Sequence, residues 1–160
     1  MQTDYMFLGM DGGLTKNKEQ QLATVQVFYD MQGGSLEACQ VQAKGKSTGY
    51  PCAVGTLFLD SLGTNKMVLQ SDGEAAIQKA CRQIKALRGS PTFLRATPKD
   101  SHASNGGAEN AVGRLARWIR INKIAVEKRY AITIGTEHYL LPWLFRHAAW
   151  FIIRFSAGPD

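Results

Sequence analysis

Three carboxylates, Asp4, Asp72 and Glu109, stand where an acidic side chain either is uncommon or begins a helix. Acids brought within bonding distance repel one another unless a divalent cation neutralises them. Mg²⁺ prefers oxygen ligands, takes few of them from the protein, and leaves the rest to water or phosphate. A pair of such ions activates an attacking oxygen and stabilises a leaving one in phosphodiester chemistry. These residue types therefore indicate metal-assisted phosphoryl transfer, if the fold brings them together.

Glu109 follows a polar, glycine-rich stretch, 104–108, and falls in the first turn of an expected helix. On a helical wheel the acid lies just outside the apolar arc of that helix. It shares its line with two small residues and two bases: Gly113, Ala116, Arg120 and Lys123. The small residues leave room for a ligand, and the bases suit backbone phosphates. Further bases, Arg114, Arg117 and Lys128, fall on the opposite border and are expected in solvent.

Each acid also has an ordinary structural explanation. Ser71 and Glu74 form a capping-box pattern, and Asp72 and Glu74 favour a helix N-terminus through the helix dipole. Taken alone, capping is the commoner role for Asp72. The dipole equally accounts for Glu109. Asp4, inside a strand, needs a partner, a metal or solvent at a sheet edge. For each residue taken singly, both readings stay open.

The rest of the chain predicts the elements that position these acids. Alternating or valine-rich runs predict strands over 3–8, 23–29, 35–43, 66–70 and 92–96, with a hairpin turn at 30–34. Apolar residues at helical spacing predict helices between 47 and 63, between 74 and 89, and from residues 108 and 138 onward. This order predicts an α/β fold, with a five-stranded mixed sheet and helices on both faces. Asp72 then ends a buried strand, at the edge where sites form in open α/β sheets.

Length and composition bound the possibilities. The 160 residues fit a single domain, 1–160, and the net charge of +6 is compatible with a nucleic-acid partner. The cysteines, Cys39, Cys52 and Cys81, form no CxxC pair, which argues against a disulfide scaffold or a structural zinc site and favours a reducing compartment.

No signal peptide is evident, because acids and glycines interrupt any apolar run at the start of the chain. The most apolar segment, 139–155, contains Pro142, Arg146 and Arg154, which do not suit a membrane-spanning helix. We therefore expect no membrane partner and an intracellular location, nuclear or cytoplasmic.

Together these residues resemble the catalytic core of a retroviral-type or copia-like retrotransposon integrase of the DDE class. Asp4 matches the strand acid, Asp72 the second acid, and Glu109 the third, with 36 residues between Asp72 and Glu109. Ser104 and Asn105 begin a match to the signature Ser-[Gln/Asn]-Gly-x-x-Glu. The predicted order of strands and helices also matches the RNase H-like fold of that family.

The resemblance implies a polynucleotidyl transferase and endonuclease that nicks element DNA ends and joins them to target DNA. It implies that Asp4, Asp72 and Glu109 bind two Mg²⁺ or Mn²⁺ ions, and that Ser104 and Asn105 contact DNA. It further implies a homo-oligomer, and a chain that is a piece of a longer polyprotein.

The chain departs from the family pattern on the DNA-facing side of the third acid. The family often carries lysines four and seven residues after the glutamate, where this chain has Gly113 and Ala116. DNA contacts are therefore expected from Arg120 and Lys123 instead.

Two other functions stay open. One is a catalytically inactive integrase-like domain that only binds nucleic acid or a partner chain. The other is a related RNase H-like metal nuclease that cleaves strands without joining them. The Ser-Asn-Gly-x-x-Glu stretch favours the integrase.

Overall fold

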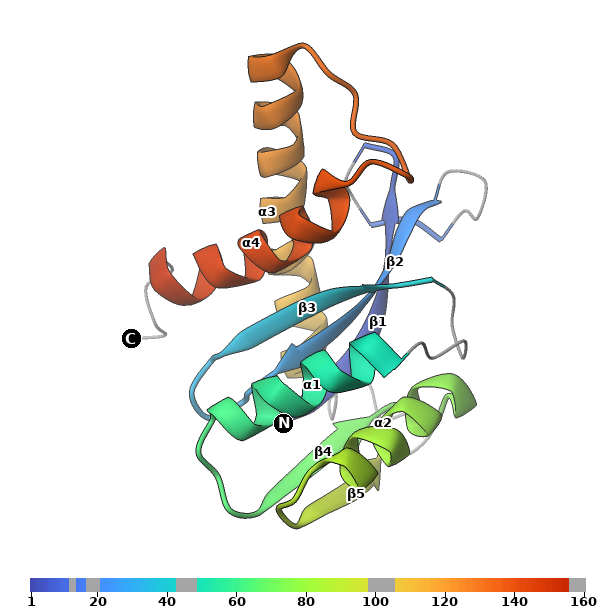
Figure 1. The fold of residues 1–160 in the computed structure, drawn as a ribbon, viewed down its shortest axis with the longest axis vertical. Coiled ribbons are helices and arrows are strands. Elements are labelled where there is room, and N and C mark those ends of the chain that lie inside the picture. Colours follow the sequence, from blue (N-terminus) through green and yellow to red (C-terminus); the bar gives the residue numbers. More distant parts are fainter. Residues whose placement is uncertain (12–13, 17–20, 43–48, 98–105, 156–160) are drawn as a thin grey trace.

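The structure is a computed structural model that describes residues 1–11, 14–16, 21–42, 49–97 and 106–155 (Figure 1). Its elements follow the order that the sequence predicts. They are β1 (Gln2–Gly9), β2 (Gln21–Tyr29), β3 (Leu36–Val41), α1 (Gly49–Ser61), β4 (Met67–Ser71), α2 (Ala75–Leu87), β5 (Thr92–Ala96), α3 (Gly106–Tyr130) and α4 (Leu140–Phe155).

The five strands form one mixed sheet in the order β3-β2-β1-β4-β5. The first three strands are antiparallel neighbours, whereas β4 runs parallel to both β1 and β5. The turn between β2 and β3 is the expected hairpin. Asp30 holds it, because its carboxylate oxygens accept the N–H groups of Gln32 and Gly33 at 3.2 and 2.8 Å. Gly34 completes the turn with a φ of 71°, a conformation that glycine adopts without steric cost.

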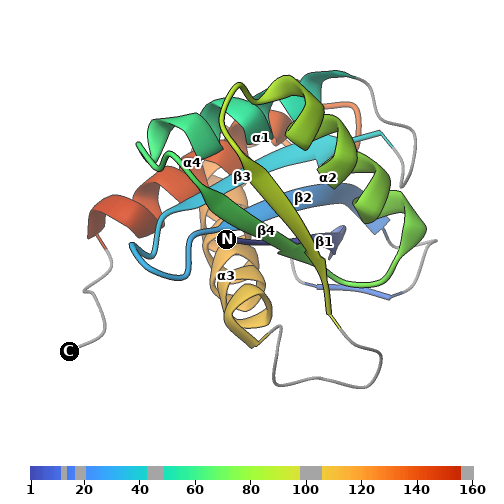
Figure 2. The same cartoon turned by 90° about the horizontal axis from the view of Figure 1, so that it is seen from below.

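Helices cover both faces of the sheet, as predicted, and each face has its own apolar core. Figure 2 shows α1 and α2 on one side and α3 on the other. The core under α3 and α4 joins residues of the two helices to residues of β1, β2 and β3, among them Leu115 of α3, Met6 of β1 and Val25 of β2. The core under α1 and α2 is built around Phe28, Leu69 and Ile84. The fold is therefore a three-layer α/β arrangement of the RNase H-like type.

Gly55 lets α1 approach the sheet closely. A Cβ at this position would lie 2.6 Å from Cζ of Phe28 and 2.9 Å from Cδ1 of Ile84. Real Cβ atoms do not come so near, so any side chain here would push α1 away from β2 and α2. A glycine inside a helix has a cost in helix propensity, and the close packing offsets it.

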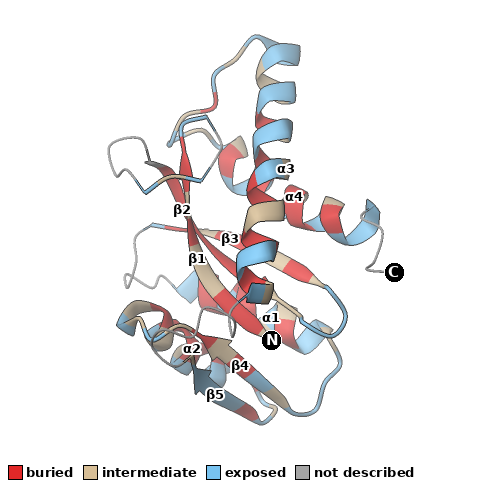
Figure 3. Cartoon of the chain, turned by 180° about the vertical axis from the view of Figure 1, so that it is seen from behind, coloured by how far each residue is buried: buried red, intermediate tan, exposed pale blue. Residues whose placement is uncertain are grey.

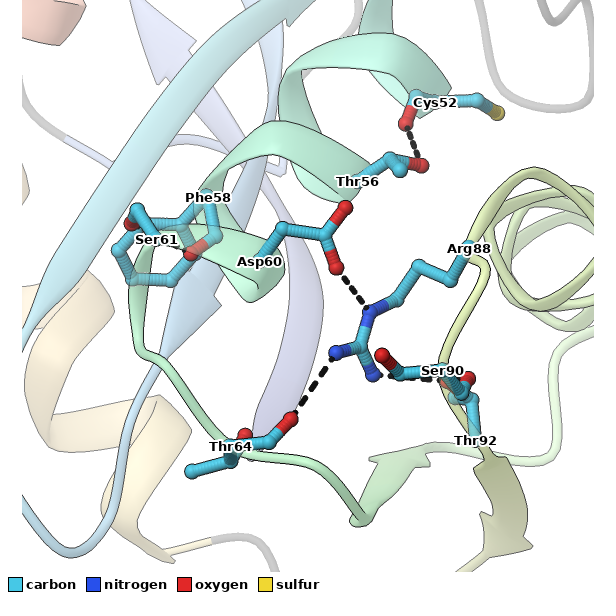
Figure 4. A network of polar contacts seen from close by, with 9 residues as sticks. All are labelled: Cys52, Thr56, Phe58, Asp60, Ser61, Thr64, Arg88, Ser90 and Thr92. Atoms are coloured by element: carbon cyan, nitrogen blue, oxygen red, sulfur yellow. Dashed lines mark hydrogen bonds and ion pairs between the residues drawn. The ribbon is translucent and has the colours of Figure 1, made fainter.

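Arg88, directly after α2, connects the C-terminal end of α1 to the first residue of β5 (Figure 4). Its guanidinium is buried and donates to Asp60 Oδ1 at 2.8 Å, to Thr92 Oγ1 at 2.8 Å and to the carbonyl of Thr64 at 3.4 Å. Three acceptors around one buried cation fix the C-terminal end of α2 relative to the loop that follows α1.

The apolar segment near the C-terminus forms α4, which packs against β3 and α3 through Leu141, Leu144, Phe145 and Ala148. Among the described residues, no helix has the length and apolarity needed to cross a membrane.

Candidate active site

Asp4 and Asp72 belong to neighbouring parallel strands. Gln2 on β1 is in register with Gln70 on β4. Each acid follows its member of this pair by two residues, Asp4 within β1 and Asp72 directly after the last residue of β4. The strand end that the sequence singled out for Asp72 therefore lies next to the strand that carries Asp4.

The first turn of α3 is fixed onto β1 by a buried glutamine. Gln2 Oε1 accepts the backbone N–H of Ala108 at 2.9 Å, which satisfies one of the N–H groups that a helix start leaves without a partner. Gly107 makes this approach possible. A Cβ there would lie 3.0 Å from Gln2 Oε1 and 3.4 Å from Cε1 of Tyr29. The first turn of α3, which contains Glu109, is therefore attached to the strand that carries Asp4.

Strand periodicity puts Gln2 and Asp4 on one face of β1, the face that α3 covers. Asp4 is half-buried there, and its Oδ1 accepts the N–H of Tyr5 at 2.7 Å. Asp72 is also half-buried, whereas Glu109 is exposed. Asp4 therefore lies on the face that α3 covers, while Asp72 follows the end of β4 and Glu109 stands in the first turn of α3.

The capping box expected at Ser71 and Glu74 is wrong. Ser71 is the last residue of β4 and its hydroxyl donates to the carbonyl of Asp72 at 3.2 Å, while Glu74 is the N-cap of α2 without a side-chain cap bond. Asp72 instead organises the turn, because its Oδ1 accepts the N–H of Glu74 at 3.1 Å. The sequence pattern failed here because β4 extends to Ser71 and α2 begins one turn later.

The donor set of the site is oxygen-only, which suits Mg²⁺ or Mn²⁺. Within the described ranges, however, no three His, Cys, Asp or Glu side chains come close enough together to hold a metal ion. β1 and β4 carry Asp4 and Asp72 on adjacent strands, and α3 carries Glu109 in its first turn, next to the Ala108 N–H that binds Gln2. The Glu109 side chain itself is not gathered into a three-acid group.

The two bases expected to contact DNA differ in their surroundings. Arg120 is 54% exposed and lies 3.6 Å from Asp11, an exposed pair of the kind that contributes little to stability. Lys123 is buried, and its Nζ donates to Glu127 Oε1 at 2.7 Å. The expectation of a phosphate ligand at Lys123 does not fit this geometry, because its ammonium is already bound within the protein. Ser104 and Asn105 lie outside the described residues.

The opposite face of β1 carries no comparable chemistry. Tyr5 points into the core under α1 and α2, and burial raises its pKa to about 12. Burial likewise raises the pKa of the Cys39 thiol to about 12, that of Cys81 to about 11, and that of Cys52. All the cysteines are free and buried, so they pack as small apolar side chains.

Gln2 is the residue that sequence reasoning missed. Its signal was present, since a polar residue two positions before Asp4 shares the face of that acid. What the sequence does not contain is its partner, because Ala108 is 106 positions away.

These features define a class: an α/β domain with a five-stranded mixed sheet in an RNase H-like arrangement. Over 99% of its length the chain is similar in structure to a chain described as "CryoEM structure of simian T-cell lymphotropic virus intasome in complex with PP2A regulatory subunit B56 gamma". The TM-score is 0.65 and the sequence identity 14%, and this chain spans 49% of the length of that chain. No family model and no curated protein matches the sequence. At this identity the likeness shows the fold.

Proposed function

We propose that this chain is an integrase-type catalytic core, which nicks DNA and joins the cut strand to a target. The observation that carries the proposal is the pairing of Gln2 on β1 with Gln70 on β4, because Asp4 and Asp72 each follow one member of this pair by two residues. The fixed start of α3, with Glu109 in its first turn, adds a third oxygen ligand on the same side. The structural likeness to a chain of a viral intasome complex supports the same class.

In the proposed site Asp4, Asp72 and Glu109 hold two Mg²⁺ or Mn²⁺ ions. Bound there, the ions supply activation of the attacking oxygen and stabilisation of the leaving one. The chain's own contribution is positioning. In this proposal the adjacent strands β1 and β4 carry two of the carboxylates, and Gln2 fixes the start of the helix that carries the third.

Arg120 is the proposed phosphate ligand on α3. It lies eleven residues after Glu109, about 16 Å along the helix axis. Its pairing with Asp11 is exposed and weak, so a DNA phosphate can replace it at little cost. The substrates are element ends and target DNA, and the proposed working form is a homo-oligomer. Ser104 and Asn105 remain proposed DNA contacts on the basis of the sequence signature.

A strand-transfer assay tests the proposal. A labelled DNA duplex end and a plasmid target are incubated with the protein and Mg²⁺ or Mn²⁺. We expect joined product from the parent, and loss of about a hundredfold or more for Asp72→Asn and for Glu109→Gln. Glu137→Gln is the matched control, since it removes an exposed acid near the start of α4 and should keep full activity. Equal activity of the parent and Glu109→Gln would exclude the proposed role of that residue.

Metal binding has a readout that is independent of turnover. Mn²⁺ broadens NMR signals of nuclei near its site, so a titration should broaden residues around Asp4 and Asp72 first. The same titration with Asp72→Asn should require a higher Mn²⁺ concentration. Broadening spread evenly over the surface would contradict a site at these acids.

A second candidate function is nucleic-acid binding without catalysis. The exposed, ungathered Glu109 side chain favours it. This candidate predicts salt-dependent DNA binding, no metal-dependent product from the parent, and no effect of the Asp72 and Glu109 variants on affinity. Cleavage without joining in the same assay would instead identify a nuclease.

A further inference from the structure

Among the described residues, no helix covers β4 and β5 on the side of the candidate active site. The core beneath α3 and α4 includes residues of β1, β2 and β3, and none from the described residues of β4 or β5. Figure 3 shows α3 passing over β1 and β2, away from β4 and β5. On this open face Val68 is in register with Phe93, and Gln70 with Arg95. Val68 is 45% exposed and Phe93 58% exposed.

A groove of about 570 Å³ runs over this open face. Its lining includes Met31, Lys66, Val68, Gln70, Phe93 and Arg95. Phe93 lies on the edge strand β5 beside the exposed Val68 of β4, so the two side chains form a small exposed apolar patch. The phenylalanine ring is thus part of a groove surface that a planar partner can cover.

The groove approaches the candidate acids along the strands, although Asp4, Asp72 and Glu109 do not line it. Gln2, Gln70 and Arg95 form one row across three parallel strands. Asp4 and Asp72 lie two residues further along their strands, about 7 Å from that row. Met31 lines the groove and lies near the start of α3, since a Cβ on Gly107 would be 3.6 Å from its Cε.

The charge of the groove is positive. Lys66 and Arg95 are both exposed and stand near opposite ends of the strand pair, about 13 Å apart along the strands. The acid that lines the groove, Asp30, already accepts N–H groups of Gln32 and Gly33 in the hairpin turn. Phe93 lies between the two bases in sequence and on the sheet.

We propose that this groove binds a single strand of nucleic acid and leads it to the acids, with Phe93 stacking on a base and Arg95 and Lys66 holding phosphates. Phe93 is a positioning and binding residue in this proposal, which rests on the proposed function for the identity of the substrate. A single strand is favoured over a duplex because an aromatic ring stacks on a base only where the face of that base is free. Basic residues beside the ring follow the backbone.

Fluorescence anisotropy with a labelled twelve-nucleotide deoxythymidine strand tests the proposal, in EDTA so that catalysis plays no part. We expect Phe93→Ala to weaken binding about tenfold, and Phe93→Tyr to restore it, because tyrosine also offers an aromatic face. Phe93→Leu keeps the bulk of the side chain and should bind as weakly as Phe93→Ala. Thermal melting of each variant shows whether the fold is retained, and the exposed position predicts that it is.

The charged residues give a second readout. Arg95→Gln should reduce the slope of log affinity against log salt by about 0.7, the release expected for one phosphate contact on a single strand. Arg129→Gln is the matched control, because it removes an exposed arginine in the last turn of α3, outside the groove. Equal losses for Arg129→Gln and Arg95→Gln would overturn the proposal in favour of unspecific attraction.

Three other outcomes would also contradict the proposal. The first is unchanged single-strand binding by Phe93→Ala. The second is loss of self-association in that variant, which would assign the groove to a second copy of the chain. The third is equal weakening of duplex and single-strand binding, which would contradict the choice of a single strand. If Phe93→Ala loses single-strand affinity while Asp72→Asn and Glu109→Gln leave strand transfer unchanged, the groove proposal stands and the proposed function fails. If the parent carries out strand transfer but Phe93→Ala keeps its single-strand affinity, the proposed function stands and the groove proposal fails.

Discussion

The side chain of Gln2 and the backbone of Ala108 are joined by a hydrogen bond of 2.9 Å between positions 106 residues apart. This bond connects the strand that carries Asp4 to the helix that carries Glu109. The acceptor side chain is 1% exposed and the bond is buried, so neither group has water as an alternative. The position of α3 on the sheet therefore depends on a polar contact as well as on the apolar core.

Gln2→Met removes the acceptor and keeps the length of the side chain. We expect the free energy of unfolding to fall by about 1–3 kcal/mol, because the Ala108 N–H is left buried without a partner. Urea unfolding measures the change. Gln32→Met, at an exposed position of the hairpin, should leave stability within about 0.5 kcal/mol of the parent.

Gly55→Ala should destabilise the fold although alanine favours helices. The new methyl group would meet Phe28 and Ile84, and overpacking of this kind costs about 1–3 kcal/mol. Gly113→Ala in α3 is the matched control, because nothing lies within 4 Å of a Cβ there. That variant should gain about 0.5–1 kcal/mol from helix propensity alone. Equal effects of the two variants in thermal or urea unfolding would contradict the packing argument.

The ion pair between Arg88 and Asp60 should respond unequally to loss of each partner. Arg88 is 1% exposed and Asp60 47% exposed. Asp60→Asn leaves a buried guanidinium without its carboxylate, and we expect a loss of about 2–4 kcal/mol. Arg88→Met leaves a carboxylate that water can solvate, so its loss should be smaller, about 1–2 kcal/mol. Unfolding in urea compares them, and the opposite order would contradict the burial argument.

Glu127 should make stability depend on pH. Burial raises the pKa of its carboxyl, but the Lys123 ammonium and the N–H of Ile134 outweigh this effect and hold the pKa below its ordinary value of 4.5. The stabilisation is therefore present above pH 4.5 and lost as pH falls through the lowered pKa. Unfolding free energies of the parent and Glu127→Gln should differ at pH 7 and converge in acid. A constant difference at all pH values would show that ionisation of Glu127 is not responsible.

The buried thiols should resist alkylation in the native state. Burial raises the pKa of Cys39 to about 12 and that of Cys81 to about 11, so little reactive thiolate exists at pH 8. We expect iodoacetamide to modify neither residue before unfolding, and both residues rapidly in denaturant. Mass spectrometry of the treated protein measures this, and fast native labelling of Cys39 would show that its pocket opens.

Local pattern was enough to predict the order of the elements. The alternation of β1, the apolar centre of β4 and the helical spacing in α3 each reflect a local rule, so the strands and helices appear where the sequence predicts them. The buried arc of α3 is likewise confirmed at Val112, Leu115 and Ile119. The fold class and the strand-end position of Asp72 follow from the same information.

Contacts between distant segments decided the rest. Lys123 looks like a surface base on a helical wheel, but the chain after α3 folds back and Glu127 binds both Lys123 and the N–H of Ile134. Three further features depend on how the parallel strands align. They are the placement of Asp4 relative to Asp72, the hydrogen bond between Gln2 and Ala108, and the exposed face at Phe93. A sequence specifies which faces are apolar, because side-chain periodicity is local. It does not show which distant polar groups meet, since that depends on the packing of the whole sheet.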